Sequence, residues 1–357
     1  MKSVTGGHKG TVTENRHDPL LAYRLGGLLY MPADKEGIVR KIEERRYPCL
    51  TSIAFCLEDA IRDEALENAE TRLRGTLSAL LRLRQEGKEI PLVFVRVRSP
   101  RHLAHVHAFL GGAGQVLTGY ILPKFDLSNA EDYAALIHSL GRADGGPLYY
   151  MPILESRMIA DAGTRVPCLK GIRRLCDGMK DRILNIRVGG ADLCSLYGLR
   201  REENQSIYEI GVIQHILTDI VNVFRPDYVV SGAVWEYFGP DPRAPWGEGL
   251  KREIALDRLN GFIGKTAIHP SQLPLICRGL QVSRRDWADA KRILEWKEPA
   301  LGVAKGGVQD RMNEVKCHIQ WARQTAALAQ IYGVRDEGGP RCGIQEKGCF
   351  AAGKTAE

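Results

Sequence analysis

The sequence lacks any long apolar run. None of its hydrophobic stretches approaches the roughly 18 residues that a membrane-spanning helix requires. Residues 1–7 lack the apolar core of a secretory signal peptide. The sequence therefore predicts a cytoplasmic protein with no membrane partner.

Paired cysteines are also missing. The chain has nine cysteines, an odd number, and no two of them form a C-x-x-C motif. Several of them, Cys49, Cys56, Cys168 and Cys194, lie beside apolar stretches. This pattern is typical of reduced, buried thiols and argues against a disulfide framework or a zinc site.

Nucleic-acid modules and complete nucleotide-binding motifs are absent as well. Residues 264–266 resemble the end of a P-loop, but the glycine that this motif needs at position 259 is Leu259. The net charge of +7 is spread over 357 residues, which is more typical of a solvated surface than of a nucleic-acid groove. We expect no nucleic-acid partner, although a basic excess would help to attract an anionic substrate.

Three histidines, His102, His105 and His107, lie close together on an Arg-rich helical stretch. The sequence offers them no clear carboxylate or cysteine partner, so we expect a solvated helix face rather than a metal cluster. His269 with Pro270 is expected to shape the turn after the last barrel strand.

Short apolar stretches that alternate with amphipathic helical stretches fill most of the chain. Eight of them are expected as strands: 25–32, 50–57, 91–97, 119–123, 148–154, 183–188, 228–233 and 261–268. This alternation predicts an α/β protein with a (β/α)₈ TIM barrel. A doubly wound open sheet is the alternative, but the nucleotide-binding fingerprint common in that fold is missing.

The remaining stretches define the expected domain organisation. We expect a flexible N-terminal arm over 1–22, the catalytic barrel over 23–280, a C-terminal helical extension over 281–334 and a disordered tail over 335–357. A long aromatic and proline-rich loop over 235–248 is expected to be a lid, a subunit contact or a base-stacking surface.

Two carboxylates follow neighbouring strands of this barrel. Glu155 comes directly after the stretch 148–154, and Asp192 comes shortly after 183–188. The C-terminal ends of parallel strands carry the chemistry of α/β folds, so both side chains are aimed at one region. Two hard oxygen ligands with open positions suit Mg²⁺. The alternative is that Glu155 caps the next helix and Asp192 holds a loop.

Other charged residues also stand at strand ends. Glu58 and Asp59 follow the second strand, Arg96 ends the third, and Lys124 follows the fourth. An arginine offers a planar fork for a carboxylate or an enolate oxygen. Together with a metal it would stabilise the enolate that forms when a bond next to a carbonyl breaks. Jointly these residues favour an enzyme.

At this point the chain resembles a known family, the citrate lyase β-subunit-like branch of the HpcH/HpaI aldolase superfamily. The resemblance covers roughly residues 28–294 and rests on six motifs in the family order. They are Cys56-Leu57-Glu58-Asp59-Ala60-Ile61, Val95-Arg96-Val97-Arg98, Leu122-Pro123-Lys124, Leu154-Glu155-Ser156, Gly189-Gly190-Ala191-Asp192-Leu193 and the stretch from Gly261 to Gln272.

The resemblance implies a TIM barrel that binds Mg²⁺ through Glu155 and Asp192. It implies that Arg96 binds the carboxylate or carbonyl oxygen of an oxo-acid, and it places Gly190 and Ala191 at the substrate. The usual reaction of the family is reversible C–C cleavage or condensation, often on acyl-CoA thioesters. Family members are commonly trimers or hexamers whose C-terminal segments help to cover a neighbour's site.

Several positions depart from the family pattern. Cys56 replaces the first acid of the acidic motif, and Arg98 replaces an asparagine. Leu66 and Glu70 stand where the family often places lysine and arginine. These departures resemble the divergent C–C bond lyase branch found in bacterial stress-response gene clusters, and they put CoA as a substrate in question. Arg98 is a candidate for reading a further carboxylate or phosphate, or for an ion pair.

We therefore expect a Mg²⁺-dependent carbon–carbon lyase or aldolase (an EC 4.1-type enzyme) that acts on an oxo-acid or an acyl-CoA-like substrate. The catalytic residues are expected to be Arg96, Glu58, Asp59 and Lys124, with Arg98 added for substrate binding. Two alternatives remain: a thioesterase-type hydrolase that uses the same site, and a non-catalytic oligomeric scaffold that binds a protein or RNA partner.

Overall fold

Eight parallel strands form one sheet in the order β7-β6-β5-β4-β3-β2-β1-β8. The computed structural model describes residues 18–142, 144–296, 303–305 and 312–335. The strands are β1 Gly27–Pro32, β2 Ser52–Cys56, β3 Leu92–Arg96, β4 Gly119–Leu122, β5 Tyr149–Leu154, β6 Ile186–Val188, β7 Val230–Ser231 and β8 Lys265–Ala267. A parallel bridge between Gly232 and Lys265 joins the two ends of this order, which closes the sheet into a barrel.

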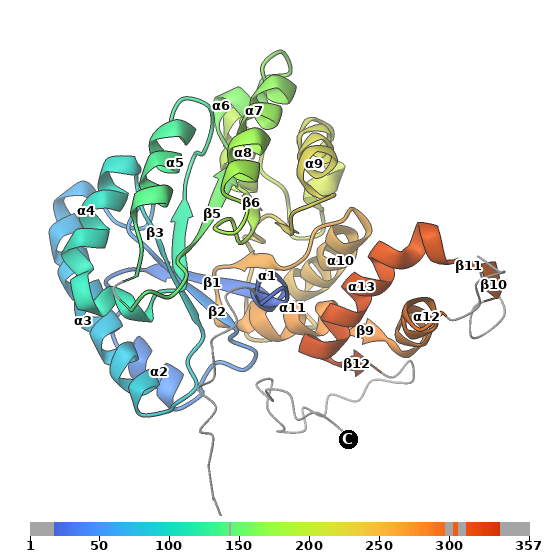
Figure 1. Ribbon diagram of the computed structural model, residues 1–357, viewed down its shortest axis with the longest axis horizontal. Helices are drawn as coiled ribbons and strands as arrows, with labels where there is room; N and C mark the ends of the chain where they lie inside the picture. Colours follow the sequence, from blue (N-terminus) through green and yellow to red (C-terminus); the bar gives the residue numbers. More distant parts are fainter. Residues whose placement is uncertain (1–17, 143, 297–302, 306–311, 336–357) are drawn as a thin grey trace, which may run out of the picture.

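Helices surround this barrel, as Figure 1 shows. They are α2 Ile38–Glu43, α3 Leu66–Gln85, α4 Pro100–Leu110, α5 Ala130–Ser139, α6 Arg157–Ala160, α7 Arg165–Gly178, α8 Gly190–Leu196, α9 Gly211–Phe224, α10 Pro245–Leu259 and α11 Leu273–Leu280. The predicted (β/α)₈ TIM barrel is confirmed. The eight strands fall within the stretches that apolar character and length had predicted.

Side-chain alternation divides the apolar residues of the strands between two cores. Residues such as Leu29, Ile53 and Val95 belong to the large core between the sheet and the helices. Their strand neighbours, including Leu28 and Phe94, belong to a smaller core inside the barrel. Because successive residues of a strand point to opposite faces, each strand contributes to both cores. The interior is thus filled with side chains below the C-terminal ends of the strands.

A helical extension follows the barrel and lies to one side of it (Figure 1). It contains α12 Arg284–Leu294 and α13 Val315–Tyr332 together with four short strands, β9 Val282–Ser283, β10 Val303–Lys305, β11 Met312–Glu314 and β12 Val334–Arg335. Strand β12 pairs with β9, and β11 pairs with β10 Val303–Lys305. The domain boundaries that the sequence suggested, 281–334 for this extension, stay a prediction.

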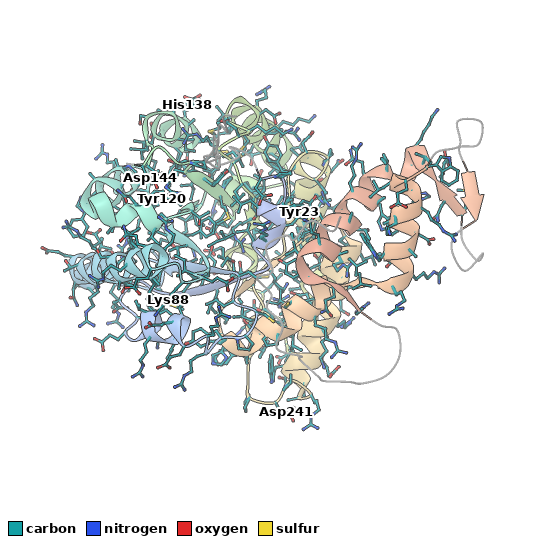
Figure 2. All side chains as sticks on the ribbon, turned by 60° about the horizontal axis from the view of Figure 1, so that its bottom comes forward. Tyr23, Lys88, Tyr120, His138, Asp144 and Asp241 are labelled. Atoms are coloured by element: carbon teal, nitrogen blue, oxygen red, sulfur yellow. The ribbon has the colours of Figure 1, made fainter. Side chains whose placement is uncertain are left out.

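The two ends of the described chain meet beside the barrel. A short helix, α1 Leu21–Arg24, precedes β1, and the hydroxyl of Tyr332 donates to the carbonyl oxygen of Tyr23 at 2.7 Å. Figure 2 shows Tyr23 between the barrel and α13. Residues 1–17 and 336–357, which include most of the expected arm and tail, lie outside the described residues.

Some local predictions need correction. Helix α10 begins at Pro245, so Trp246 and Glu248 belong to a helix and not to the predicted loop. Proline fits the first helical turn, where its missing N–H has no partner in any case. Helix α5 has Asn129 at its N-cap, and the hydroxyl of the preceding Ser128 donates to Asp126.

Among the residues described, no helix is long and apolar enough to cross a membrane. Cys56, Cys168, Cys176 and Cys194 are buried, in agreement with the buried thiols that the sequence predicted.

Candidate active site

The site is organised around Arg96, the last residue of β3. Its Nη2 atom lies 2.7 Å from Oε2 of Glu58, 3.1 Å from Oδ2 of Asp59 and 3.3 Å from Oε1 of Glu155. The side chain is 11% exposed. Charge-assisted contacts of this length hold a guanidinium in a fixed orientation. The predicted strand-end residues therefore come together at one point.

Glu155 is buried directly after β5, with 4% of its surface exposed. Its Oε1 atom accepts hydrogen bonds from the backbone N–H of Lys124 at 2.9 Å and from Arg96. Lys124 adopts a left-handed backbone with φ +49°, which is uncommon for a residue with a β-carbon. The turn after β4 is thus bent so that its N–H points at the carboxylate of Glu155.

Lys124 also contacts the acidic pair that follows β2. Its Nζ atom lies 2.8 Å from Oε1 of Glu58 and 3.7 Å from Oδ1 of Asp59. Glu58 is largely buried, whereas Asp59 is half exposed. Arg96 and Lys124 therefore hold the two carboxylates from opposite sides.

Asp192 lies in the first turn of α8, which directly follows the Gly189-Gly190 pair after β6. Its charge acts on both Glu155 and Lys124. A β-carbon at Gly189 would fall 1.8 Å from Oε2 of Glu155, so only glycine lets the carboxylate occupy its place. At Gly190 a β-carbon would meet Ala233 and Ile207 at 2.6 Å.

The predicted substrate-binding residues Gly190 and Ala191 form the first turn of α8. The first N–H groups of a helix have no partner inside the helix. Those of Gly190 and Ala191 are therefore suited to donate to an anionic group that binds next to Asp192. Gly190 is buried and Ala191 is exposed.

Burial and neighbouring charges change the acidity of these groups. Burial raises the pKa of Glu155 to about 7, with Asp192 acting in the same direction and Arg96 against it. Burial also raises the pKa of Glu58, although Arg96 opposes this. For Asp59 the effect of burial is outweighed by its hydrogen bond with Glu58 and by the charges of Arg96 and Lys124, so its pKa is lowered. Adjacent carboxyl groups with pKa values shifted in opposite directions are typical of active sites.

Two of these residues have the chemistry of magnesium ligands. Glu155 and Asp192 supply hard carboxylate oxygens, and Oε2 of Glu155 accepts no hydrogen bond from the described residues. A buried carboxylate with a raised pKa is stabilised in its ionised form by a cation. No group of three His, Cys, Asp or Glu residues in the described part of the chain has metal-binding geometry. A two-carboxylate site fits Mg²⁺, which keeps several water or substrate ligands.

Arg98 does not join this cluster. Its Nε donates to the carbonyl oxygen of Leu57 at 2.7 Å, Nη2 donates to Ile61, and Nη1 pairs with Asp63. The guanidinium therefore stabilises the loop between β2 and α3. The ion-pair role that the sequence left open fits this geometry better than substrate binding.

The histidine stretch has a carboxylate partner that the sequence did not reveal. Oε1 of the buried Glu70 lies 2.8 Å from Nε2 of His102, and Oε2 lies 3.0 Å from Nε2 of His105. The expected solvated face is thus wrong for His102, which is largely buried against α3. Glu70 and His102 are more than thirty positions apart in the sequence, so only helix packing brings them together.

The aromatic loop after β7 is packed onto the barrel. Trp235 is buried, its Nε1 donates to the carbonyl oxygen of Trp246 at 3.1 Å, and Arg201 stacks over its ring at 4.7 Å. Phe238 is 51% exposed and stacks on His269 with ring centroids 4.5 Å apart. Asp241, farther along the loop, lies at the molecular surface in Figure 2. The tryptophans therefore fix the loop and offer no exposed stacking surface.

Comparison with known proteins identifies the family of the chain. Residues 19–334 match the family model described as C–C bond lyase of the TIM-barrel fold. A (3S)-malyl-CoA thioesterase from Cereibacter sphaeroides strain KD131 is 26% identical over 312 residues, which cover 87% of this chain and 96% of that protein.

Solved structures share the fold. The protein CitE from Mycobacterium tuberculosis in complex with magnesium, acetoacetate and coenzyme A superposes with a TM-score of 0.56 and 20% identity, over 86% of this chain and 99% of that chain. RipC from Yersinia pestis superposes with a TM-score of 0.50 and 16% identity, over 72% of this chain and 95% of that chain.

Proposed function

The chain belongs to the C–C bond lyase family of the TIM-barrel fold, and from this premise we propose that it is a Mg²⁺-dependent enzyme that breaks or forms a carbon–carbon bond next to the carbonyl group of an oxo-acid. The observation that carries the proposal is the contact of Arg96 with Glu155 at the C-terminal ends of β3 and β5, where the charge of Asp192 also acts on Glu155. The solved CitE complex contains magnesium and acetoacetate, which supports this choice of metal and substrate class.

Glu155 and Asp192 would hold the metal. Bound there, Mg²⁺ supplies a Lewis acid that stabilises negative charge on a substrate oxygen. The carboxylate of Glu155 is held ready by the N–H of Lys124 and by Arg96. Gly189 keeps the space beside it open.

Arg96 is the residue that binds and orients the substrate. Its three acidic neighbours fix the guanidinium. Burial acts to lower the pKa of Arg96, but Tyr30, Glu155 and Glu58 keep this pKa above its usual range. The permanently charged guanidinium of Arg96 can donate hydrogen bonds to the carboxylate or carbonyl oxygen of an oxo-acid and stabilise the enolate. Glu58 and Asp59 position Arg96, and Lys124 offers a further charge at the mouth of the site.

Acyl-CoA thioesters are a second substrate candidate. The curated relatives carry the name (3S)-malyl-CoA thioesterase, which favours hydrolysis of a CoA thioester at the same site. The buried Glu70 argues against a CoA thioester as substrate. It stands where the family often has a cation, and its carboxylate contacts His102 and His105. Incubation with malyl-CoA separates these reactions: a lyase releases glyoxylate and acetyl-CoA, whereas a hydrolase releases malate and free CoA.

The test of the proposal is a calorimetric titration of Mg²⁺ into metal-stripped protein, with and without oxaloacetate or pyruvate. We expect wild type to bind Mg²⁺ more tightly when an oxo-acid is present, and Asp192→Ala to lose metal binding while its thermal unfolding stays cooperative. Equal binding by wild type and Asp192→Ala would contradict the proposed metal site. A scaffold protein, the remaining alternative, would have no metal affinity that depends on these carboxylates. The proposed trimeric or hexameric assembly can be measured on the same sample by light scattering.

A further inference from the structure

A second arginine lies inside the barrel, close to Arg96. Arg187 is the central residue of β6 and is 2% exposed. Its Nη2 atom donates to Oγ1 of Thr266 on β8 at 2.7 Å. Strand β7 separates β6 from β8 in the sheet, so this contact crosses the barrel interior. The guanidinium therefore points inward.

Arg187 stands below the level of the proposed metal ligands. It pairs across the sheet with Ile153, two residues before Glu155. Two residues of a strand span about 6.6 Å. Arg187 therefore lies roughly one layer of side chains deeper in the barrel than Glu155.

No carboxylate compensates the charge of Arg187 among the described residues. The structure describes five buried cationic side chains: Arg96, Arg165, Arg187, Arg201 and Lys265. The other four each form at least one ion pair with a carboxylate. Arg187 instead contacts neutral groups, namely Asn185, Thr266 and Tyr30, and its Nε has no hydrogen-bond partner in the described structure.

An uncompensated charge at this position is energetically unfavourable. A buried charge has lost its hydration and needs an opposite charge to replace it, so removal of the partner of a buried ion pair is strongly destabilising. Burial lowers the pKa of Arg187, and the positive charge of Arg96 acts in the same direction. An anion bound between the two arginines would relieve both effects.

The charges of both arginines act on Tyr30. It is on the inner face of β1, is partly exposed, and interacts with Arg187, Arg96 and Glu155. When its hydroxyl oxygen accepts a hydrogen bond from Arg187, its O–H is left to donate to another group. Tyr30 thus offers a donor next to the proposed substrate position.

We propose that Arg187 and Tyr30 form a second anion-binding site inside the barrel, below the level of Glu155, which takes a carboxylate of the substrate while Arg96 takes the carbonyl end. The substrate class is then an oxo-dicarboxylic acid and not a monocarboxylic one. This inference rests on the proposed function for the identity of the oxo-acid, but the anion site itself does not require the metal.

The experiment compares dicarboxylates with monocarboxylates in the full-length protein. With Mg²⁺ present, we titrate freshly dissolved oxaloacetate and pyruvate into wild type, Arg187→Met and Arg187→Lys. Without metal, we titrate malonate and acetate. We expect Arg187→Met to lower the affinity for oxaloacetate and malonate at least tenfold and to change the affinity for pyruvate and acetate less than twofold. Arg187→Lys should be intermediate. Arg243→Met, which removes a charge from an exposed side chain, is the matched control and should bind like wild type.

Thermal unfolding with and without malonate gives a second measurement, whose expected result differs from that of a purely structural role of Arg187. Methionine removes the uncompensated charge at similar length, so Arg187→Met should melt at or above the temperature of wild type and lose the rise that malonate causes. A lower melting temperature with an unchanged preference for dicarboxylates would overturn the proposal. If Arg187→Met does not fold, Tyr30→Phe decides, with an expected three- to tenfold loss of dicarboxylate affinity alone.

The two proposals fail in different ways. Malonate binding that depends on Arg187, without Mg²⁺-dependent binding of any oxo-acid, would overturn the proposed function and keep the anion site. Mg²⁺-dependent oxo-acid binding that neither Arg187→Met nor Tyr30→Phe changes would overturn the anion site and keep the proposed function. The absence of dicarboxylate binding by wild type in either titration would overturn the anion site.

Discussion

Gly189 lies so close to Glu155 that a β-carbon at position 189 would fall 1.8 Å from Oε2 of the carboxylate. The two residues follow neighbouring strands, β6 and β5, and Gly189 donates its N–H to the carbonyl oxygen of Leu154 at 3.3 Å. Because Gly189 has no side chain, the carboxylate of Glu155 can occupy the space directly after β6.

The first prediction follows from this contact. In Gly189→Ala the new methyl group cannot coexist with the present position of Glu155, so the carboxylate must move. We expect Mg²⁺ affinity to fall at least tenfold, measured by calorimetry. Gly75→Ala is the matched control, since a β-carbon there meets nothing within 4 Å and the helix gains about 0.5–1 kcal/mol of stability. Wild-type metal affinity in Gly189→Ala would show that Glu155 is not a ligand.

The second prediction concerns the left-handed turn at Lys124. In Lys124→Gly the backbone N–H that holds Glu155 remains, while the Nζ contact with Glu58 is lost. Glycine adopts positive φ without strain, so unfolding in urea should give a free energy within about 1 kcal/mol of wild type. Mg²⁺ affinity should be retained and turnover should fall about tenfold.

Lys124→Met separates the two contributions of this residue. It removes the same charge but keeps a β-carbon in the left-handed turn. We expect the same loss of turnover as in Lys124→Gly and an equal or lower stability. Full activity in both variants would exclude Lys124 from the site.

The third prediction is a pH dependence. The folded-state pKa of Glu155 is raised from 4.5 to about 7 by burial, so the metal-free fold favours the protonated acid. Its stabilising contribution is complete below pH 4.5 and is lost as the pH rises through 7. The difference in unfolding free energy between wild type and Glu155→Gln should therefore change in favour of the variant between pH 5 and pH 8, by up to about 3 kcal/mol.

Denaturant unfolding of metal-stripped wild type and Glu155→Gln at both pH values measures this difference. Other titrating groups are common to the two proteins and cancel in the comparison. Saturating Mg²⁺ should restore the stability of wild type at pH 8, because it favours the ionised carboxylate. A difference that does not vary with pH would contradict the raised pKa.

The fourth prediction concerns a buried ion network behind β8. Glu253, which is fully buried, accepts from Nζ of Lys265 at 2.8 Å and from the backbone N–H of Ile207 at 2.9 Å, and it pairs with Arg201. Glu253→Ala leaves two buried cations with fewer partners, so we expect a loss of about 3–5 kcal/mol in unfolding free energy. Glu248→Ala, on the same helix but exposed, should change it by less than about 1 kcal/mol. Equal effects would show that the network contributes little.

The alternation of apolar stretches was enough to predict the barrel, because a buried parallel strand needs a continuous apolar run and a helix to cover it. The same alternation placed Glu58, Arg96, Lys124 and Glu155 at strand ends, where a barrel brings side chains together. Helix starts were harder to predict. Pro245 opens α10 inside a stretch whose prolines and aromatic residues had indicated a loop.

By itself, then, the sequence determined the barrel, the family resemblance and the ring of charged residues at its mouth, since these depend on local periodicity and on position along each strand. Only the tertiary structure decided which of those residues contact one another. In the folded chain Arg98 binds the loop after β2, Glu70 contacts two histidines, and Gly189 packs directly against Glu155. It also left Arg187 inside the barrel without an acidic partner in the described structure. Such pairings depend on distances across the barrel and between helices, which the order of residues along one strand does not fix.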